Sequence, residues 1–174
     1  MSISAALLPE FDYEMQNTRK MLERVPEGKG DFKPHPKSMP LARLAGHIAE
    51  LPNWAVETIS RDSMDLTAMM ASGFKPYVMT TRKELLDAFD KNVANARAAI
   101  AGASDQHLMQ IWSLIVNGEK VLQLPRAAVL RSSVMNHIIH HRAQLGVYLR
   151  MNDVALPGMY GPSGDEPNMF AAGQ

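Results

Sequence analysis

The sequence predicts an all-α protein: a four-helix bundle with one short extended or hairpin insert before the last helix. Hydrophobic residues recur at three- and four-residue intervals in four separate stretches, and connections rich in proline and glycine lie between them. Of the 174 residues, 46% are hydrophobic, which is enough to fill one core. We therefore expect a single domain over residues 1–174, in which residues 152–174 form an irregular C-terminal tail.

The first predicted helix covers residues 4–25, and either Ser2 or Ser4 is available as its N-cap. Residues 26–40 contain four prolines and must form a loop. Ser38 is then predicted to cap a second helix that reaches about Ser60.

Pro52 lies inside this second helical pattern. A proline there removes a backbone hydrogen bond, so we expect a kink or a split just past His47.

The third helix is predicted to begin after Thr80 or Thr81, because Glu84 completes a capping box, and to end at Gly102. One short helical turn is expected before it, at residues 66–71. Residues 110–124 alternate apolar and polar positions around Asn117-Gly118, which favours a small hairpin or an extended connection. The last long helix is expected to run from Pro125 to about Met151.

The composition argues against several kinds of partner and metal ligand. Lysine plus arginine equals aspartate plus glutamate at 18 each, so the basic field typical of nucleic-acid binding is missing, and we expect no nucleic-acid partner. Cysteine is absent, so any metal must be held by histidine, aspartate or glutamate. We expect no membrane partner and a cytoplasmic location, because no stretch resembles a membrane span or a signal peptide.

Three histidines form the most informative constellation. His137 and His141 are four residues apart in a helical segment, so their rings stack on one face and can converge on one point. His47 lies on the apolar face of the second helix and supplies a third ligand. The alternative is that these are core histidines satisfied by hydrogen bonds.

Three histidines match the ligand count of a catalytic zinc site whose fourth position stays open. Nickel, iron or manganese could use the same nitrogen ligands, so the identity of the ion stays open. A di-iron site is disfavoured, because it needs Glu-x-x-His on two helices and only the reversed order from His47 to Glu50 is present.

Three residues close in sequence to the proposed metal ligands are candidates for a catalytic role, on weaker grounds than the ligands themselves. His140 is turned by about 100° from His141 on a helix, so it is placed on the flank, where it could orient a ligand, contact a dimer partner or act as an acid–base group. Arg142 could anchor a carboxylate or form a salt bridge. Glu50 could act as a base, accept the ring N–H of a ligand histidine, or pair with Arg142.

The segments LARLAGHIAELPNW and HIIHHRAQLGVYLR, followed by LPGMYGPSGDE, resemble the DinB/YfiT-like family of small bacterial proteins over nearly the whole chain. This resemblance implies a four-helix bundle, usually a homodimer, with a divalent metal on His47, His137 and His141. Zinc and nickel are the favoured ions. The family is more distantly similar to mycothiol-dependent maleylpyruvate isomerase and to bacillithiol S-transferases, in which the metal activates a low-molecular-weight thiol.

Two functions follow as hypotheses. The first is a divalent-metal-dependent enzyme, a thiol-dependent S-transferase or isomerase, or a hydrolase, acting on a small molecule. The second is a non-catalytic, metal-binding, dimeric protein with a stress-linked interaction role. The sequence contains no recognisable nucleophile motif, phosphate-binding loop or dinucleotide fingerprint, and this absence favours the second hypothesis.

Overall fold

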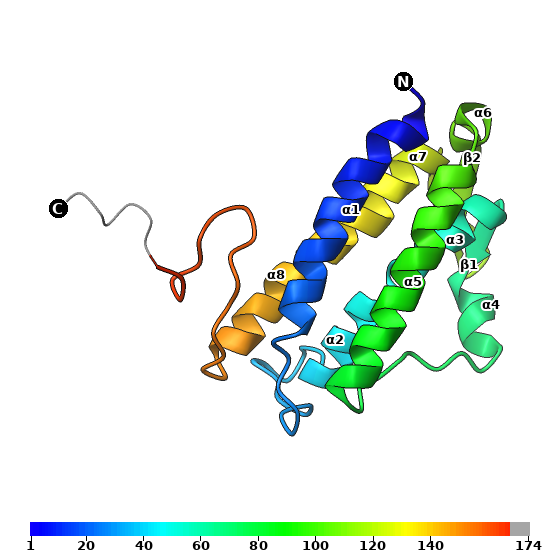
Figure 1. The fold of residues 1–174 in the computed structure, drawn as a ribbon. Coiled ribbons are helices and arrows are strands. Elements are labelled where there is room, and N and C mark those ends of the chain that lie inside the picture. Colours follow the sequence, from blue (N-terminus) through cyan, green and yellow to red (C-terminus); the bar gives the residue numbers. More distant parts are fainter. Residues whose placement is uncertain (168–174) are drawn as a thin grey trace.

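A computed structural model of the chain describes residues 1–167 and shows a mostly helical fold with one small sheet (Figure 1). The last part of the predicted tail, residues 168–174, lies outside the described residues. None of the described helices is long and apolar enough to cross a membrane.

Two long helices begin at the caps that the sequence predicts. α1 spans Ile3–Leu22, and the hydroxyl of Ser2 accepts a hydrogen bond from the amide of Ala5. α5 spans Arg82–Gly102, and the hydroxyl of Thr81 accepts from the amide of Glu84. Each cap satisfies an amide that has no partner inside its helix, which explains why the helices begin there.

The second predicted helix is split in two at the expected place. α2 spans Leu41–Glu50, and α3 spans Asn53–Ser60, directly after Pro52. The predicted cap was wrong: Pro40, not Ser38, precedes the first residue of α2 and contributes no side-chain cap. The amide of Ser38 instead donates to the carbonyl of His35 within the loop.

A three-stranded sheet corrects the all-α prediction. β2 (Ile111–Val116) and β3 (Glu119–Pro125) form the predicted antiparallel hairpin, and Asn117 and Gly118 turn it with φ of 52° and 79°. β1 (Ser63–Asp65) pairs in parallel with β2 and was not predicted. The short helices α4 (Leu66–Ala71) and α6 (Asp105–Leu108) lie between β1 and β2 in sequence.

The last helical segment is continuous but changes its winding. α7 (Arg126–Val129) leads into a π-helical stretch, η1 (Leu130–Asn136), and then into α8 (His137–Arg150). A π-helix closes its hydrogen bonds over five residues instead of four, so it holds more residues per turn than the flanking α-helices.

The helices enclose one main core (Figure 1). α1 packs against α5 and α8, and α2 packs against the same two helices from the other side. The sheet is attached through a smaller cluster, in which Trp112 packs with Met64 and Val129. Fully buried side chains of the main core come from all of these helices: Phe11, Leu22, Leu44, Ile48, Phe89 and Leu145.

Candidate metal centre

His47, His137 and His141 converge, as the sequence analysis expected. Nε2 of His137 lies 2.9 Å from Nε2 of His141 and 3.5 Å from Nε2 of His47. All three rings are half-buried, and one ligand nitrogen from each lies within 4.8 Å of the others. Residues 90 positions apart in the chain thus meet at one point between α2 and α8.

His47 is held near the end of α2. The backbone amide of Leu51 still bonds the carbonyl of His47, but Pro52 has no amide to continue the pattern. The helix therefore ends one turn past the histidine. Trp54, at the start of α3, faces the site from there and lies edge-on to the ring of His137 at 6.1 Å between centroids.

His137 and His141 sit at the start of α8, directly after the π-helical stretch. The four-residue spacing puts them on one face, with ring centroids 4.7 Å apart. Extra residues in a π-turn rotate everything that follows relative to a straight α-helix. Residues 130–136 therefore set the direction in which the pair faces.

The nitrogens that point away from the convergence face hydrogen-bond acceptors. Nδ1 of His141 lies 2.8 Å from the side-chain oxygen of Gln144, so this nitrogen carries the proton and donates it. Nδ1 of His47 lies 3.9 Å from a carboxylate oxygen of Glu50. With its proton on Nδ1, His141 presents the lone pair of Nε2 to the other two rings.

This geometry fits a divalent cation. Two nitrogens bound at about 2.0–2.1 Å in tetrahedral directions lie about 3.3 Å apart, and the two observed separations fall on either side of that value. The acceptors behind His141 and His47 are the kind that orient histidine ligands in metal sites. Imidazole binds several divalent transition metals, so this ligand set does not select one of them.

The pKa values of the two α8 histidines favour the neutral, metal-binding form. Burial lowers the pKa of His141 to about 4, and the neighbouring histidines add to the shift. Burial and the ring of His47 also lower the pKa of His137, although a hydrogen bond with the backbone of Ser133 opposes this. Near neutral pH both rings are unprotonated and able to coordinate.

Glu50 connects the histidine cluster to the segment that follows α4. One carboxylate oxygen accepts a hydrogen bond from Arg43 at 3.1 Å, and the other accepts from the backbone amide of Tyr77. Burial alone would raise the pKa of the Glu50 carboxyl. The ring of His47 and the hydrogen bonds with Tyr77 and Arg43 lower that pKa overall.

His140 and Arg142 lie on other faces of α8. His140 is exposed, and its ring centroid is 4.9 Å from that of His141. Arg142 is buried and forms a 2.7 Å ion pair with Glu14 on α1. It also donates to the backbone carbonyl of Glu14, to the hydroxyl of Thr18 and to the hydroxyl of Tyr160. The expected pairing of Glu50 with Arg142 was therefore wrong, because Arg43 takes that place.

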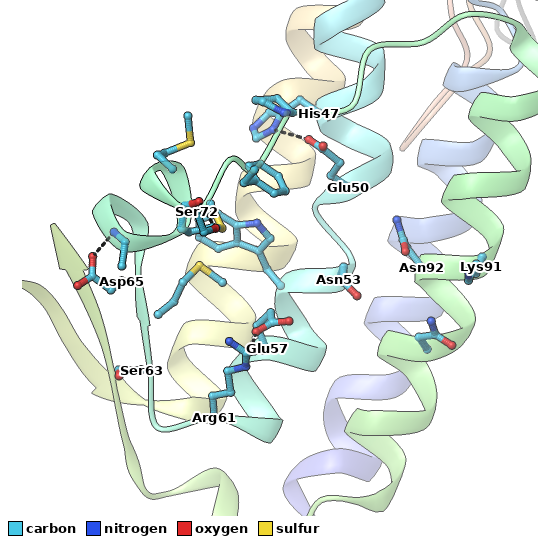
Figure 2. Close-up of a pocket in the computed structure, with 18 of the residues that line it drawn as sticks. His47, Glu50, Asn53, Glu57, Arg61, Ser63, Asp65, Ser72, Lys91 and Asn92 are labelled. Atoms are coloured by element: carbon cyan, nitrogen blue, oxygen red, sulfur yellow. Dashed lines mark hydrogen bonds and ion pairs between the residues drawn. The ribbon is translucent and has the colours of Figure 1, made fainter.

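A cleft of about 890 Å³ opens beside His47 (Figure 2). Helices α2 and α3 form its floor, α5 one side, and β1, α4 and the following segment the other. In Figure 2, His47 and Glu50 lie at one end of the group of labelled residues, and Glu57 and Arg61 lie at the other. Sequence reasoning missed Arg43 and Tyr77 at this site, since no local pattern signals a contact between α2 and the segment after α4.

Comparison with known proteins agrees with this fold. The DinB superfamily matches residues 10–145. A DinB-like protein from Bacillus cereus has a similar structure, with a TM-score of 0.67 and 24% identity over 88% of this chain and 95% of that chain. One from Bacillus subtilis has a TM-score of 0.67 and 19% identity over 88% and 97% of the two chains. No curated protein matches significantly. Because the superfamily match covers most of the sequence, the chain belongs to the DinB superfamily.

Proposed function

We propose that this protein is a divalent-metal-dependent enzyme whose helical core, a four-helix bundle, holds the ion on His47, His137 and His141. The convergence of one ring nitrogen from each of the three histidines, within 4.8 Å of one another, carries this proposal. When bound, such an ion lowers the pKa of a coordinated thiol or water and so supplies a nucleophile near neutral pH. Zinc and nickel are the ions that the family resemblance favours, and iron or manganese are the other candidates.

The chain's own residues would position the ligands and the substrate. Gln144 fixes the tautomer of His141, and Glu50 faces Nδ1 of His47. The cleft adjoins the cluster at His47, which lines it together with Trp54, so a substrate in the cleft would lie beside this ligand. His140 is placed for proton exchange with solvent beside His141, since it is exposed and in ring contact.

The reaction class follows from the resemblance to thiol-dependent enzymes. We propose S-transfer or isomerisation with a low-molecular-weight thiol, in a cytoplasmic homodimer. Size-exclusion chromatography with light scattering tests the dimer. A screen of thiols against small electrophiles tests the reaction once the metal has been identified.

The first experiment is elemental analysis of protein purified without a histidine tag. We expect about one equivalent of zinc, nickel, iron or manganese in wild type and in His140→Ala, and little in His47→Ala or His141→Ala. His140→Ala is the matched control, since it removes an exposed histidine of the same helix. Absence of metal from wild type, even after incubation with each ion, would mean that the three histidines are core residues.

A further inference from the structure

One side of the cleft beside His47 is apolar and adaptable. β1, α4 and the segment after α4 contribute methionines and an aromatic ring, and Trp54 extends this surface toward the histidine cluster. Met70 and Phe74 are 55% and 42% exposed. Methionine adapts its shape to the molecule that it contacts. The apolar wall consists of Trp54, Met64, Met69, Met70, Phe74 and Pro76.

The other side of the cleft is polar. Three asparagines and one lysine line it, from α3 and α5: Asn53, Lys91, Asn92 and Asn95. Asn92 donates a hydrogen bond to the carbonyl of Ala49, which fixes its side chain. In Figure 2, the consecutive residues Lys91 and Asn92 lie on α5, across from Asn53 and Glu57 on α3.

The cations that line the cleft differ in their partners. Arg43 is paired with Glu50 at 3.1 Å, and Arg61 with Glu57 at 3.0 Å. Lys91 forms no ion pair within residues 1–167. The remaining acid of the lining, Asp65, accepts the amide of Ala68 and caps α4. Among the described residues that line the cleft, Lys91 is thus the positively charged side chain that is free to pair with an anionic ligand.

The backbone of the segment after α4 is anchored to α2. Both backbone groups of Tyr77 are bound by α2, because its amide donates to Glu50 and its carbonyl accepts from Arg43 at 3.1 Å. Gly46 permits this contact: a Cβ there would lie 2.3 Å from the carbonyl oxygen of Tyr77. The segment after α4 is therefore anchored one turn from His47, which holds this end of the apolar wall beside the histidine cluster.

We infer that this cleft binds a small organic anion with an apolar body, whose acidic group pairs with Lys91 while the body lies on the apolar wall. The volume of about 890 Å³ is within the range of small-molecule sites, about 300–1,000 Å³. This inference rests on the proposed function and names the substrate class that the metal-bearing end of the cleft would act on. It uses no metal ligand, so it is testable separately.

The test is isothermal titration of the full-length protein, with and without zinc, using octanoate and octan-1-ol. We expect octanoate to bind about three- to tenfold more tightly than the alcohol, as for one added charge-assisted contact. Lys91→Ala should remove this preference. Lys83→Ala should keep it, because Lys83 lies on the same helix, is paired with Asp87 and does not line the cleft. Met69→Asp should lower the affinity for both ligands by about tenfold or more.

Other outcomes separate this inference from the proposed metal function. Equal affinity for the two ligands, or a preference that survives in Lys91→Ala, overturns the inference. Octanoate binding that needs zinc and ignores Lys91 places the carboxylate on the ion, which also overturns it while supporting the metal site. Lys91-dependent binding by a protein that takes up no metal, even after incubation with each ion, supports the inference and contradicts the proposed function.

Discussion

Gln144 accepts a hydrogen bond from Nδ1 of His141 at 2.8 Å, three residues further along α8. Replacing Gln144 with leucine should lower the affinity for zinc by about tenfold or more, because the ring loses the contact that fixes its tautomer and orientation. Competition with a chromophoric chelator measures this affinity. Gln144→Glu, which keeps an acceptor, should bind zinc like wild type. Equal affinity in the leucine variant would show that the ring is oriented by packing alone.

The lowered pKa of His141 predicts a pH dependence for the metal-free protein. The unfolded chain protonates this ring near its ordinary pKa of 6.5, whereas burial lowers the folded pKa to about 4. The unfolded state therefore binds the extra proton between these values, and stability should fall as pH decreases from 6.5 toward 4.

Thermal melts of chelator-treated protein between pH 7 and pH 5 measure this dependence. The slope of melting temperature against pH should be smaller in His141→Gln than in wild type. His35→Gln is the control, since His35 is exposed in the loop before α2, and its slope should match that of wild type. A His141→Gln slope as steep as that of wild type would contradict the prediction.

Arg142 should matter for stability, not for metal binding. Replacing it with methionine leaves Glu14 buried without its partner, and we expect a loss of about 3–5 kcal/mol in the free energy of unfolding. The control Arg150→Met removes an exposed pair with Asp165, which solvent screens, and should cost far less. Urea denaturation measures both. A drop in zinc affinity in folded Arg142→Met, without a loss of stability, would assign Arg142 to the site instead.

Gly46 should tolerate no side chain. In Gly46→Ala the new Cβ would meet the carbonyl of Tyr77 at 2.3 Å, so α2 and the segment after α4 must separate. We expect a loss of about 1–3 kcal/mol, measured by urea denaturation. Gly146→Ala, also inside a helix, makes only ordinary contacts, 3.6 Å from Met21 and 4.0 Å from Leu156, and should be neutral or stabilising. Similar stability in the two variants would contradict the close approach at Tyr77.

Local signals predicted most of the helices and the hairpin. Pro52 splits the second helix, Thr81 caps α5, and Asn117-Gly118 turns the hairpin, because each acts on the backbone within a few residues. β1 was missed because three residues carry no periodicity of their own. Its partner strand is about 50 positions away, and only the folded chain brings the two together.

The same distinction applies to the site. The convergence of His47 with His137 and His141 was predicted, since each lies on the apolar face of a long helix. The partners of the charged residues were not predicted. Arg142 pairs with a residue on α1, and Arg43 reaches the backbone of Tyr77, so both contacts depend on which helices become neighbours.

The π-helical stretch before His137 separates two properties of the histidine pair. The distance between the rings depends on the four-residue spacing inside α8. The direction in which both side chains point around the helix axis depends on residues 130–136. Losing one residue from that stretch would swing both rings by about 100° while keeping them a matched pair. Insertions and deletions upstream of α8 therefore turn the same two histidines together toward a different neighbouring helix. A point substitution does not produce this change.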